Sequence, residues 1–257
     1  MELSFYKYQG TGNDFIMIDN RNELFNSSDN QLVARLCDRR FGIGADGLIL
    51  LENDPQADFK MVYFNSDGNT SSMCGNGGRC IVKFAYDLGV ISDKTTFMAI
   101  DGLHDAYIEN NLVHLKMINV DQIEKNEAFF FMNTGSPHYI EFVNELESFP
   151  VYAEGYKIRN NDRFKKEGTN VNFVQCISSD TIGVRTYERG VEDETWSCGT
   201  GVTASAIAAS FKGYQSPVNV VTKGGNLLIT FAVRDQTYEE VFLCGPAERV
   251  FAGVVNI

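Results

Sequence analysis

Two stretches, Cys74-Gly-Asn-Gly-Gly-Arg-Cys-Ile-Val-Lys-Phe-Ala85 and Cys198-Gly-Thr-Gly-Val-Thr-Ala-Ser-Ala-Ile-Ala-Ala209, share a Cys-Gly-x-Gly start followed by an apolar helical pattern. The two cysteines stand 124 residues apart in a chain of 257. A repeat spaced at nearly half the chain length predicts two similar lobes related by a pseudo-twofold axis.

Around these stretches the sequence indicates short strands joined mostly by hairpin-length connections. This pattern predicts an α+β fold with antiparallel sheets. We expect an N-terminal lobe over residues 1–117, completed by the C-terminal tail 247–257, and a C-terminal lobe over residues 118–246. Asp29 is expected to cap a further helix that buries Leu32, Val33 and Leu36.

Composition excludes several classes of protein. A formal net charge of −12 and a pI near 4.7 leave no cluster of basic residues to neutralise phosphates, so no nucleic-acid partner is expected. No apolar run approaches the roughly 20 residues of a bilayer span, and the N-terminus has no export signal, so we expect a cytoplasmic protein without a membrane role. The sequence leaves open whether the chain forms a homodimer.

Each repeated cysteine is expected at the first turn of a helix, where unsatisfied N–H groups and the helix dipole favour an anion. Such a position lowers the pKa of a thiol and makes it reactive. A single cysteine there is more often a small buried hydrophobe, but two in matched contexts favour a joint catalytic role. We expect the other four cysteines, which have apolar surroundings, to lie in the core: Cys37, Cys80, Cys176 and Cys244.

The sequence predicts neither a metal site nor a cofactor. None of the six cysteines forms a Cys-x-x-Cys pair, so a zinc site is not expected. Gly42-Ile-Gly-Ala-Asp-Gly47 matches the dinucleotide fingerprint, but an expected helix precedes it and an expected strand follows, the reverse of the required order. Two thiols suffice to invert an amino-acid Cα, because one can remove a proton from one face while the other delivers a proton to the opposite face.

Six segments in order along the chain resemble the motifs of diaminopimelate epimerases. The match continues to Gly245-Pro-Ala247, so it covers almost the whole chain. The segments are Tyr8-Gln-Gly-Thr-Gly-Asn-Asp-Phe15, Phe64-Asn-Ser-Asp-Gly68, Met73-Cys-Gly-Asn-Gly-Gly-Arg-Cys80, Gly168-Thr-Asn-Val171, Tyr187-Glu-Arg-Gly190 and Ser197-Cys-Gly-Thr-Gly201. The resemblance implies that each lobe is a mostly antiparallel sheet or barrel around a central helix. It also implies cofactor-independent interconversion of LL- and meso-diaminopimelate in lysine and peptidoglycan precursor biosynthesis.

The resemblance assigns roles to particular residues. Cys74 and Cys198 would be the catalytic pair, with Glu188 near the reacting amino group and His138 as a further catalytic candidate. The remaining candidates would bind substrate: Gly75, Asn76, Gly199 and Thr200 at the reacting carboxylate, Arg189, Asn65 and Asn170 at the distal carboxylate, and Asn13 at the distal end. Asn13 and Asn65 also suit glycine-rich turns, and Glu188-Arg189 also suits a solvated ion pair.

At two positions the chain departs from the family pattern. Gly47 stands where many members have glutamine, which removes one expected side-chain contact to the substrate. Ser136 stands where the family usually has asparagine, so Ser136 is taken as a substrate contact in its place.

Two alternatives stay open at this point. Proline and hydroxyproline epimerases also use two cysteines without a cofactor, although their small ring substrates have no distal carboxylate for Arg189 to bind. A thiol redox switch, in which Cys74 and Cys198 form a reversible disulfide, is the alternative outside enzymes.

Overall fold

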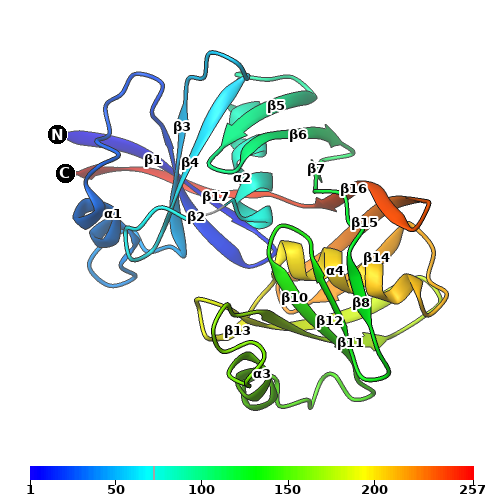
Figure 1. The fold of residues 1–257 in the computed structure, drawn as a ribbon. Helices are drawn as coiled ribbons and strands as arrows, with labels where there is room; N and C mark the ends of the chain where they lie inside the picture. Colours follow the sequence, from blue (N-terminus) through cyan, green and yellow to red (C-terminus); the bar gives the residue numbers. More distant parts are fainter. Residues whose placement is uncertain (72) are drawn as a thin grey trace. The chain divides into compact units, whose positions relative to one another are not determined.

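The structure is a computed structural model, and it describes residues 1–71 and 73–257. The chain folds into two compact units: Met1–Leu115 together with Pro246–Ile257, and Lys116–Gly245. Each unit combines a mostly antiparallel sheet with a buried helix, so the expected α+β class is confirmed (Figure 1).

The described residues of the first unit form β1 (Glu2–Gly10), β2 (Asn13–Asp19), α1 (Asn30–Cys37), β3 (Gly47–Glu52), β4 (Phe59–Asn65), α2 (Gly75–Asp87), β5 (Lys94–Ala99), β6 (Gly102–Glu109), β7 (Leu112–Lys116) and β17 (Glu248–Asn256). The strands pair in the order β17-β1-β2-β3-β4-β5-β6-β7. Strands from the two ends of the chain, β1 and β17, therefore lie side by side (Figure 1).

The described residues of the second unit form β8 (Ile123–Lys125), β9 (Phe130–Asn133), β10 (Pro137–Phe142), α3 (Val151–Arg159), β11 (Asn170–Cys176), β12 (Thr181–Glu188), β13 (Asp193–Thr195), α4 (Gly199–Ser210), β14 (Val218–Thr222), β15 (Gly225–Arg234) and β16 (Thr237–Gly245). Their pairing order is β8-β9-β10-β11-β12-β14-β15-β16, with the short β13 also beside β12.

The two sheets repeat the same pattern of strand directions. In the first unit β2·β3 and β4·β5 are parallel and the other pairs are antiparallel. In the second unit the parallel pairs are β10·β11 and β12·β14, at the same places in the order. The repeat read from the two Cys-Gly-x-Gly stretches thus extends to the whole topology of each unit.

Among the described residues, each helix lies on the crossover between two parallel strands. α1 joins β2 to β3, α2 joins β4 to β5, α3 joins β10 to β11, and α4 lies between β12 and β14. Parallel neighbours need such long connections because the chain must return to the same end of the sheet. The sequence predicts mostly antiparallel sheets without saying which strands are parallel, so the positions of these four parallel pairs are a finding of the structure.

Local sequence explains how the two central helices begin and end. Cys74 and Cys198 precede α2 and α4 as N-cap residues with extended backbone angles, φ −107° and ψ 129° for Cys74 and φ −119° and ψ 112° for Cys198. Gly89 and Gly213 follow the helices with φ of +70° and +97°, a conformation that suits glycine and stops a helix. Nearly every residue of α4 is buried, as expected for a helix that is apolar all round.

Apolar packing holds the first sheet between two helices. α1 is capped by the Asp29 side chain, which accepts a hydrogen bond from the Leu32 N–H at 2.9 Å, as the sequence predicts. Its buried residues Val33, Leu36 and Cys37 pack on one face of the sheet. Helix α2 packs against β1, β2 and β3.

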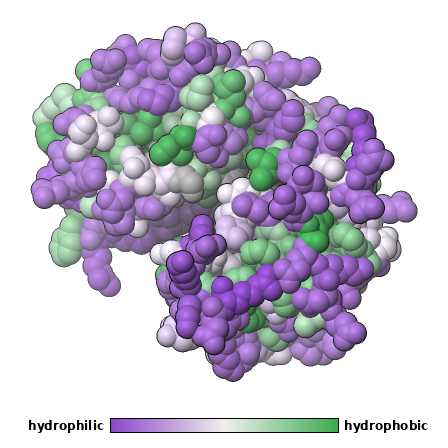
Figure 2. Space-filling view, viewed as in Figure 1, coloured by the Kyte–Doolittle hydropathy of each residue, from purple (hydrophilic) through white to green (hydrophobic). Residues whose placement is uncertain are grey.

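One face of the molecule is largely polar. The face shown in Figure 2 is covered mainly by hydrophilic side chains, with hydrophobic residues in small patches. In the described part of the chain, no helix has both the length and the apolar character that a bilayer span requires.

Candidate active site

The candidate residues of the first unit gather at the start of α2. The Cys74 thiol donates to the Asn13 Oδ1 at 3.7 Å, and the Asn76 Nδ2 donates to the same oxygen at 3.4 Å. The Asn13 Nδ2 in turn donates to the Asp46 Oδ2 at 2.7 Å. Because a carboxylate oxygen can only accept from this amide, the Asn13 oxygen must be the atom that faces the thiol.

A buried arginine fastens the start of α2 to the rest of its unit. Arg79 has no exposed surface. Its guanidinium donates to the Thr11 Oγ1 at 3.1 Å, to the Gly75 carbonyl at 3.3 Å and to the Pro246 carbonyl at 3.4 Å. Arg79 belongs to the Met73–Cys80 motif, but the sequence alone did not predict a role for it. Its position one turn after Gly75 is the signal that could have suggested this helix-end contact.

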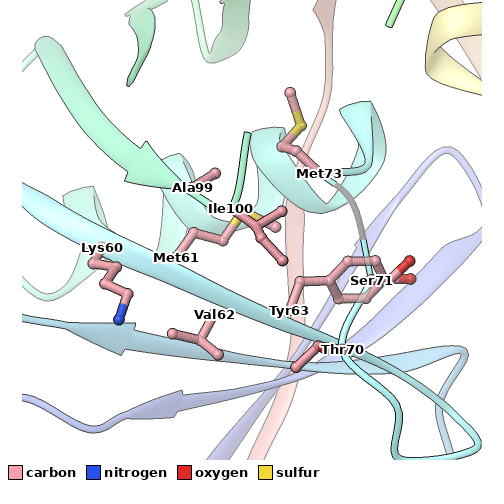
Figure 3. Close-up of a pocket in the computed structure, with 9 residues that line it drawn as sticks. All are labelled: Lys60, Met61, Val62, Tyr63, Thr70, Ser71, Met73, Ala99 and Ile100. Atoms are coloured by element: carbon pink, nitrogen blue, oxygen red, sulfur yellow. The ribbon is translucent and has the colours of Figure 1, made fainter. Parts of the chain in front are cut away.

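Asn65 lies at the end of β4, directly opposite Gly47 on β3. A Cβ at position 47 would lie 2.5 Å from the Phe64 carbonyl oxygen and 2.6 Å from Cε2 of Tyr63, so the backbone and the tyrosine ring together leave no room for a longer side chain. Tyr63 and Met73 also line a pocket of about 220 Å³ beside this site (Figure 3). A tyrosine ring thus packs against Gly47, the position at which many family members have glutamine.

The candidate residues of the second unit converge on one imidazole. The His138 Nε2 lies 2.8 Å from the Thr200 Oγ1 and 3.0 Å from the Ser136 Oγ, and these two hydroxyls are 3.1 Å apart. The Thr200 Oγ1 is 3.5 Å from the Cys198 sulfur. The structure thus connects His138 to the second thiol through a hydroxyl, a link that the sequence did not predict.

Burial keeps the His138 imidazole neutral. Its side chain is inaccessible to solvent. Desolvation, together with the positive charge of Arg189, lowers the pKa of His138 to about 3. At neutral pH the ring therefore carries one hydrogen and offers one nitrogen as an acceptor.

Asn170 connects this cluster to Arg189. The Asn170 Nδ2 donates to the Ser136 Oγ at 3.1 Å, while the Asn170 Oδ1 accepts from the backbone N–H of Arg189 at 2.9 Å. The neighbouring Glu188 accepts from the Thr195 hydroxyl at 2.9 Å. The exposed Arg189 side chain donates to the Glu167 carbonyl at 3.0 Å.

The other cysteines mostly match the expectation of a core role. Cys37, Cys80 and Cys244 are buried. Desolvation raises the pKa of both Cys37 and Cys80 to about 12, so these thiols stay protonated and unreactive. The expectation for Cys176 was wrong, because it is the last residue of β11 and its side chain is exposed.

No candidate metal centre emerges in residues 1–71 and 73–257, because no three His, Cys, Asp or Glu side chains converge there. Hydrogen bonds connect Asn13 and Asn76 to Cys74 at the start of α2, and they connect Ser136, His138 and Thr200 beside Cys198 at the start of α4. Each cluster presents a cysteine and the first N–H groups of a helix, which are suited to an anion such as a carboxylate.

Comparison with known proteins decides the family. The family model "Diaminopimelate epimerase" matches residues 5–110 and 130–250. The chain is 55% identical to the diaminopimelate epimerase of Flavobacterium psychrophilum over 97% of its own length and 98% of that protein. This chain belongs to the diaminopimelate epimerase family. It is therefore an enzyme of the isomerase class, acting as an epimerase. The diaminopimelate epimerase of Aquifex aeolicus is 42% identical, with 98% of this chain and 97% of that protein covered.

Solved structures of similar fold extend beyond the diaminopimelate epimerase family. A Bacillus anthracis phenazine biosynthesis protein of the PhzF family matches with a TM-score of 0.77 and 14% identity, with both chains fully covered. A hydroxyproline epimerase from Agrobacterium vitis matches with a TM-score of 0.67 and 15% identity, over 99% of this chain and 92% of that chain. At such identities the likeness establishes a shared fold and nothing about substrate.

Proposed function

We propose that this epimerase interconverts LL- and meso-2,6-diaminopimelate without a cofactor, using Cys74 and Cys198 as its two acid–base groups. The observation that carries the proposal is the matched placement of the two thiols. Each thiol belongs to the N-cap residue of a helix that connects two parallel strands. The two parallel pairs, β4·β5 and β12·β14, occupy the same place in the strand order of their sheets.

The chemistry needs one thiolate and one thiol. The thiolate takes the proton from the substrate Cα, and the resulting carbanion receives a proton on its opposite face from the other thiol. The charge that develops on the reacting carboxylate would be stabilised by the N–H groups at the two helix starts, those of Gly75, Asn76, Gly199 and Thr200. After each turnover the two sulfurs have exchanged protonation states, and the reverse reaction restores them.

The remaining groups would select and orient the substrate. Arg189 suits the distal carboxylate because a guanidinium can hold a carboxylate through two hydrogen bonds, and Asn65 would add an amide donor. Asn170 would hold Arg189 at that end of the substrate, because its Oδ1 accepts from the Arg189 backbone N–H. Glu188 would bind the reacting amino group, while Asn13 and Ser136 would complete the pocket. The product, meso-diaminopimelate, would serve lysine and peptidoglycan precursor synthesis in the cytoplasm.

Isotope exchange tests this proposal. Purified protein, kept reduced and given LL-diaminopimelate in deuterium oxide, should equilibrate the LL and meso isomers and incorporate deuterium at Cα. Cys74→Ala and Cys198→Ala should each abolish epimerisation, because inversion needs a thiol on both faces of the Cα. Cys37→Ala serves as the matched control, because it removes a buried thiol and should affect stability alone.

Three results would contradict the proposal. Near-normal turnover in Cys74→Ala would remove that thiol from the mechanism. Turnover of proline with none of diaminopimelate would favour the ring-substrate alternative. Reversible formation of a Cys74–Cys198 disulfide without any Cα exchange would favour a redox switch.

A further inference from the structure

The amide of Asn172, on β11, has only one orientation that satisfies its neighbours. Its Nδ2 lies 3.0 Å from the Tyr139 carbonyl oxygen, which can only accept, so the hydrogens are on that end. Its Oδ1 accepts from the Thr186 hydroxyl at 2.9 Å. The second amide hydrogen then points at the His138 Nδ1, 3.0 Å away. Asn172 therefore requires a lone pair on that ring nitrogen.

This requirement determines where the single hydrogen of the neutral His138 ring lies. With a lone pair on Nδ1, the hydrogen is on Nε2 and donates to the Thr200 Oγ1 at 2.8 Å, the nearer of its two hydroxyl neighbours. Thr200 is itself held in place, because the Thr134 hydroxyl donates to the Thr200 carbonyl at 2.8 Å. The Thr200 hydroxyl, having accepted from His138, keeps its own hydrogen for another acceptor.

Two acceptors are within reach of that hydrogen, the Cys198 sulfur at 3.5 Å and the Ser136 Oγ at 3.1 Å. A hydrogen bond to an anion is about twice as strong as one between neutral groups, so a Cys198 thiolate would attract it. In the other ring tautomer, Nε2 would be an acceptor and would take the Thr200 hydrogen for itself. The tautomer thus decides whether the Thr200 hydroxyl can donate to the second sulfur.

In the first unit the cysteine sulfur faces a hydrogen-bond acceptor instead of a donor. The Cys74 sulfur faces the Asn13 Oδ1 at 3.7 Å, and the hydrogen bond from Asn13 to Asp46 keeps that oxygen turned towards it. An oxygen acceptor favours the protonated thiol, which can donate, over a thiolate, which cannot.

We propose that the two half-sites hold their thiols in opposite resting states, Cys198 as thiolate and Cys74 as thiol, and that Asn172 is a positioning residue that enforces this by fixing the His138 tautomer. The inference rests on the proposed function for its catalytic meaning: Cys198 would be the base and Cys74 the acid when substrate first arrives. Its structural content is measurable without substrate, so it can fail while the epimerisation chemistry stands.

The tautomer is tested by nitrogen-15 NMR of the side chain of His138, one of only three histidines in the chain. The wild type should show a protonated Nε2 and an unprotonated Nδ1 at neutral pH. Asn172→Asp, which replaces the amide donor with an acceptor, should place a hydrogen on Nδ1. Thr186→Val, the matched control, removes a neighbouring hydrogen bond and should leave the tautomer unchanged. A hydrogen on Nδ1 in the wild type would overturn the inference.

The resting states are tested by thiolate absorbance in the ultraviolet at neutral pH. Cys198→Ser should remove the thiolate signal, whereas Cys74→Ser should leave it. Thr200→Val deletes the hydrogen bond to the sulfur and should slow alkylation of Cys198 by about tenfold or more, corresponding to the roughly 1.5 kcal/mol or more of a hydrogen bond to a charged group, with no change at Cys74. Loss of the signal in Cys74→Ser alone, or unchanged Cys198 alkylation in Thr200→Val, would refute the proposed states.

Discussion

Gly201 and Asn172 approach each other so closely that a Cβ at position 201 would lie 2.3 Å from the Asn172 Oδ1. Gly77 occupies the matched position in the other repeat, three residues after its cysteine. There the atoms nearest to a Cβ would be the side-chain ends of Ile49 and Met61, at 3.1 and 3.3 Å, followed by the Phe15 ring at 3.6 Å. The second glycine of the Cys-Gly-x-Gly repeat is thus packed more tightly in the second unit than in the first.

This difference predicts unequal costs for the same substitution. Gly201→Ala should lower the free energy of unfolding by roughly 1–3 kcal/mol, because Asn172 is fixed by hydrogen bonds and cannot move aside cheaply. Gly77→Ala should be close to neutral, since flexible side-chain ends can shift and alanine favours a helix by up to about 1 kcal/mol. Urea unfolding of the two variants checks this, and equal costs would contradict it.

The low pKa of His138 predicts a loss of stability in mild acid. The unfolded state binds a proton below about pH 6.5, whereas the folded state resists protonation down to about pH 3. The free energy of unfolding therefore falls as the pH is lowered between these values, by about 2–3 kcal/mol at pH 4.5.

His138→Gln should remove most of this pH dependence. The comparison is made by urea unfolding of both proteins at pH 6.5 and pH 4.5. Asp14, whose pKa is lowered to about 2 by Arg39 and Lys7, contributes at lower pH and does not obscure the difference. An identical slope in the two proteins would show that His138 is not the group responsible.

The ion pair between Asp14 and Lys7, 2.7 Å apart, is predicted to be important for folding. The Lys7 side chain is only 7% exposed, so Asp14→Asn would leave a buried charge unpaired and should cost roughly 2–4 kcal/mol of stability. Arg39→Ala is the control, because Arg39 contacts the same carboxylate with a side chain that is 58% exposed. That variant should lose about 1 kcal/mol or less. Thermal unfolding of both variants measures the contrast, and a larger loss in Arg39→Ala would reverse this assignment.

Arg189 is predicted to contribute to substrate affinity through its shape as well as its charge. Arg189→Lys keeps the charge but cannot form the paired hydrogen bonds to a carboxylate, so KM for diaminopimelate should rise about tenfold or more. Arg234→Lys, an exposed change at the end of β15 where the side chain contacts Glu239, should leave KM unchanged. Steady-state kinetics of both variants test the role, and an unaltered KM in Arg189→Lys would exclude it.

The sequence by itself determined the repeat, the two helix starts and the cap at Asp29, because each depends on neighbouring residues alone. A cysteine before a glycine-rich helical pattern indicates an N-cap wherever the chain later folds. The sequence did not predict helix α3. This helix buries only Val151 and Gly155 and leaves Tyr152 and Tyr156 exposed, so its apolar residues show no clear helical period. Asn172 stands two residues after the candidate Asn170, and that strand spacing was the one signal that could have drawn attention to it.

Only the tertiary structure decided which strands lie parallel and which groups surround each thiol. Asp46 reaches Asn13 across 33 residues, and Asn172 reaches His138 across 34. Such contacts depend on strand register, which is set by the packing of whole sheets and cannot be read from local sequence. Because hydrogen bonds have direction, these distant partners determine which atoms of Asn13 and His138 face the sulfurs and their hydroxyl neighbours.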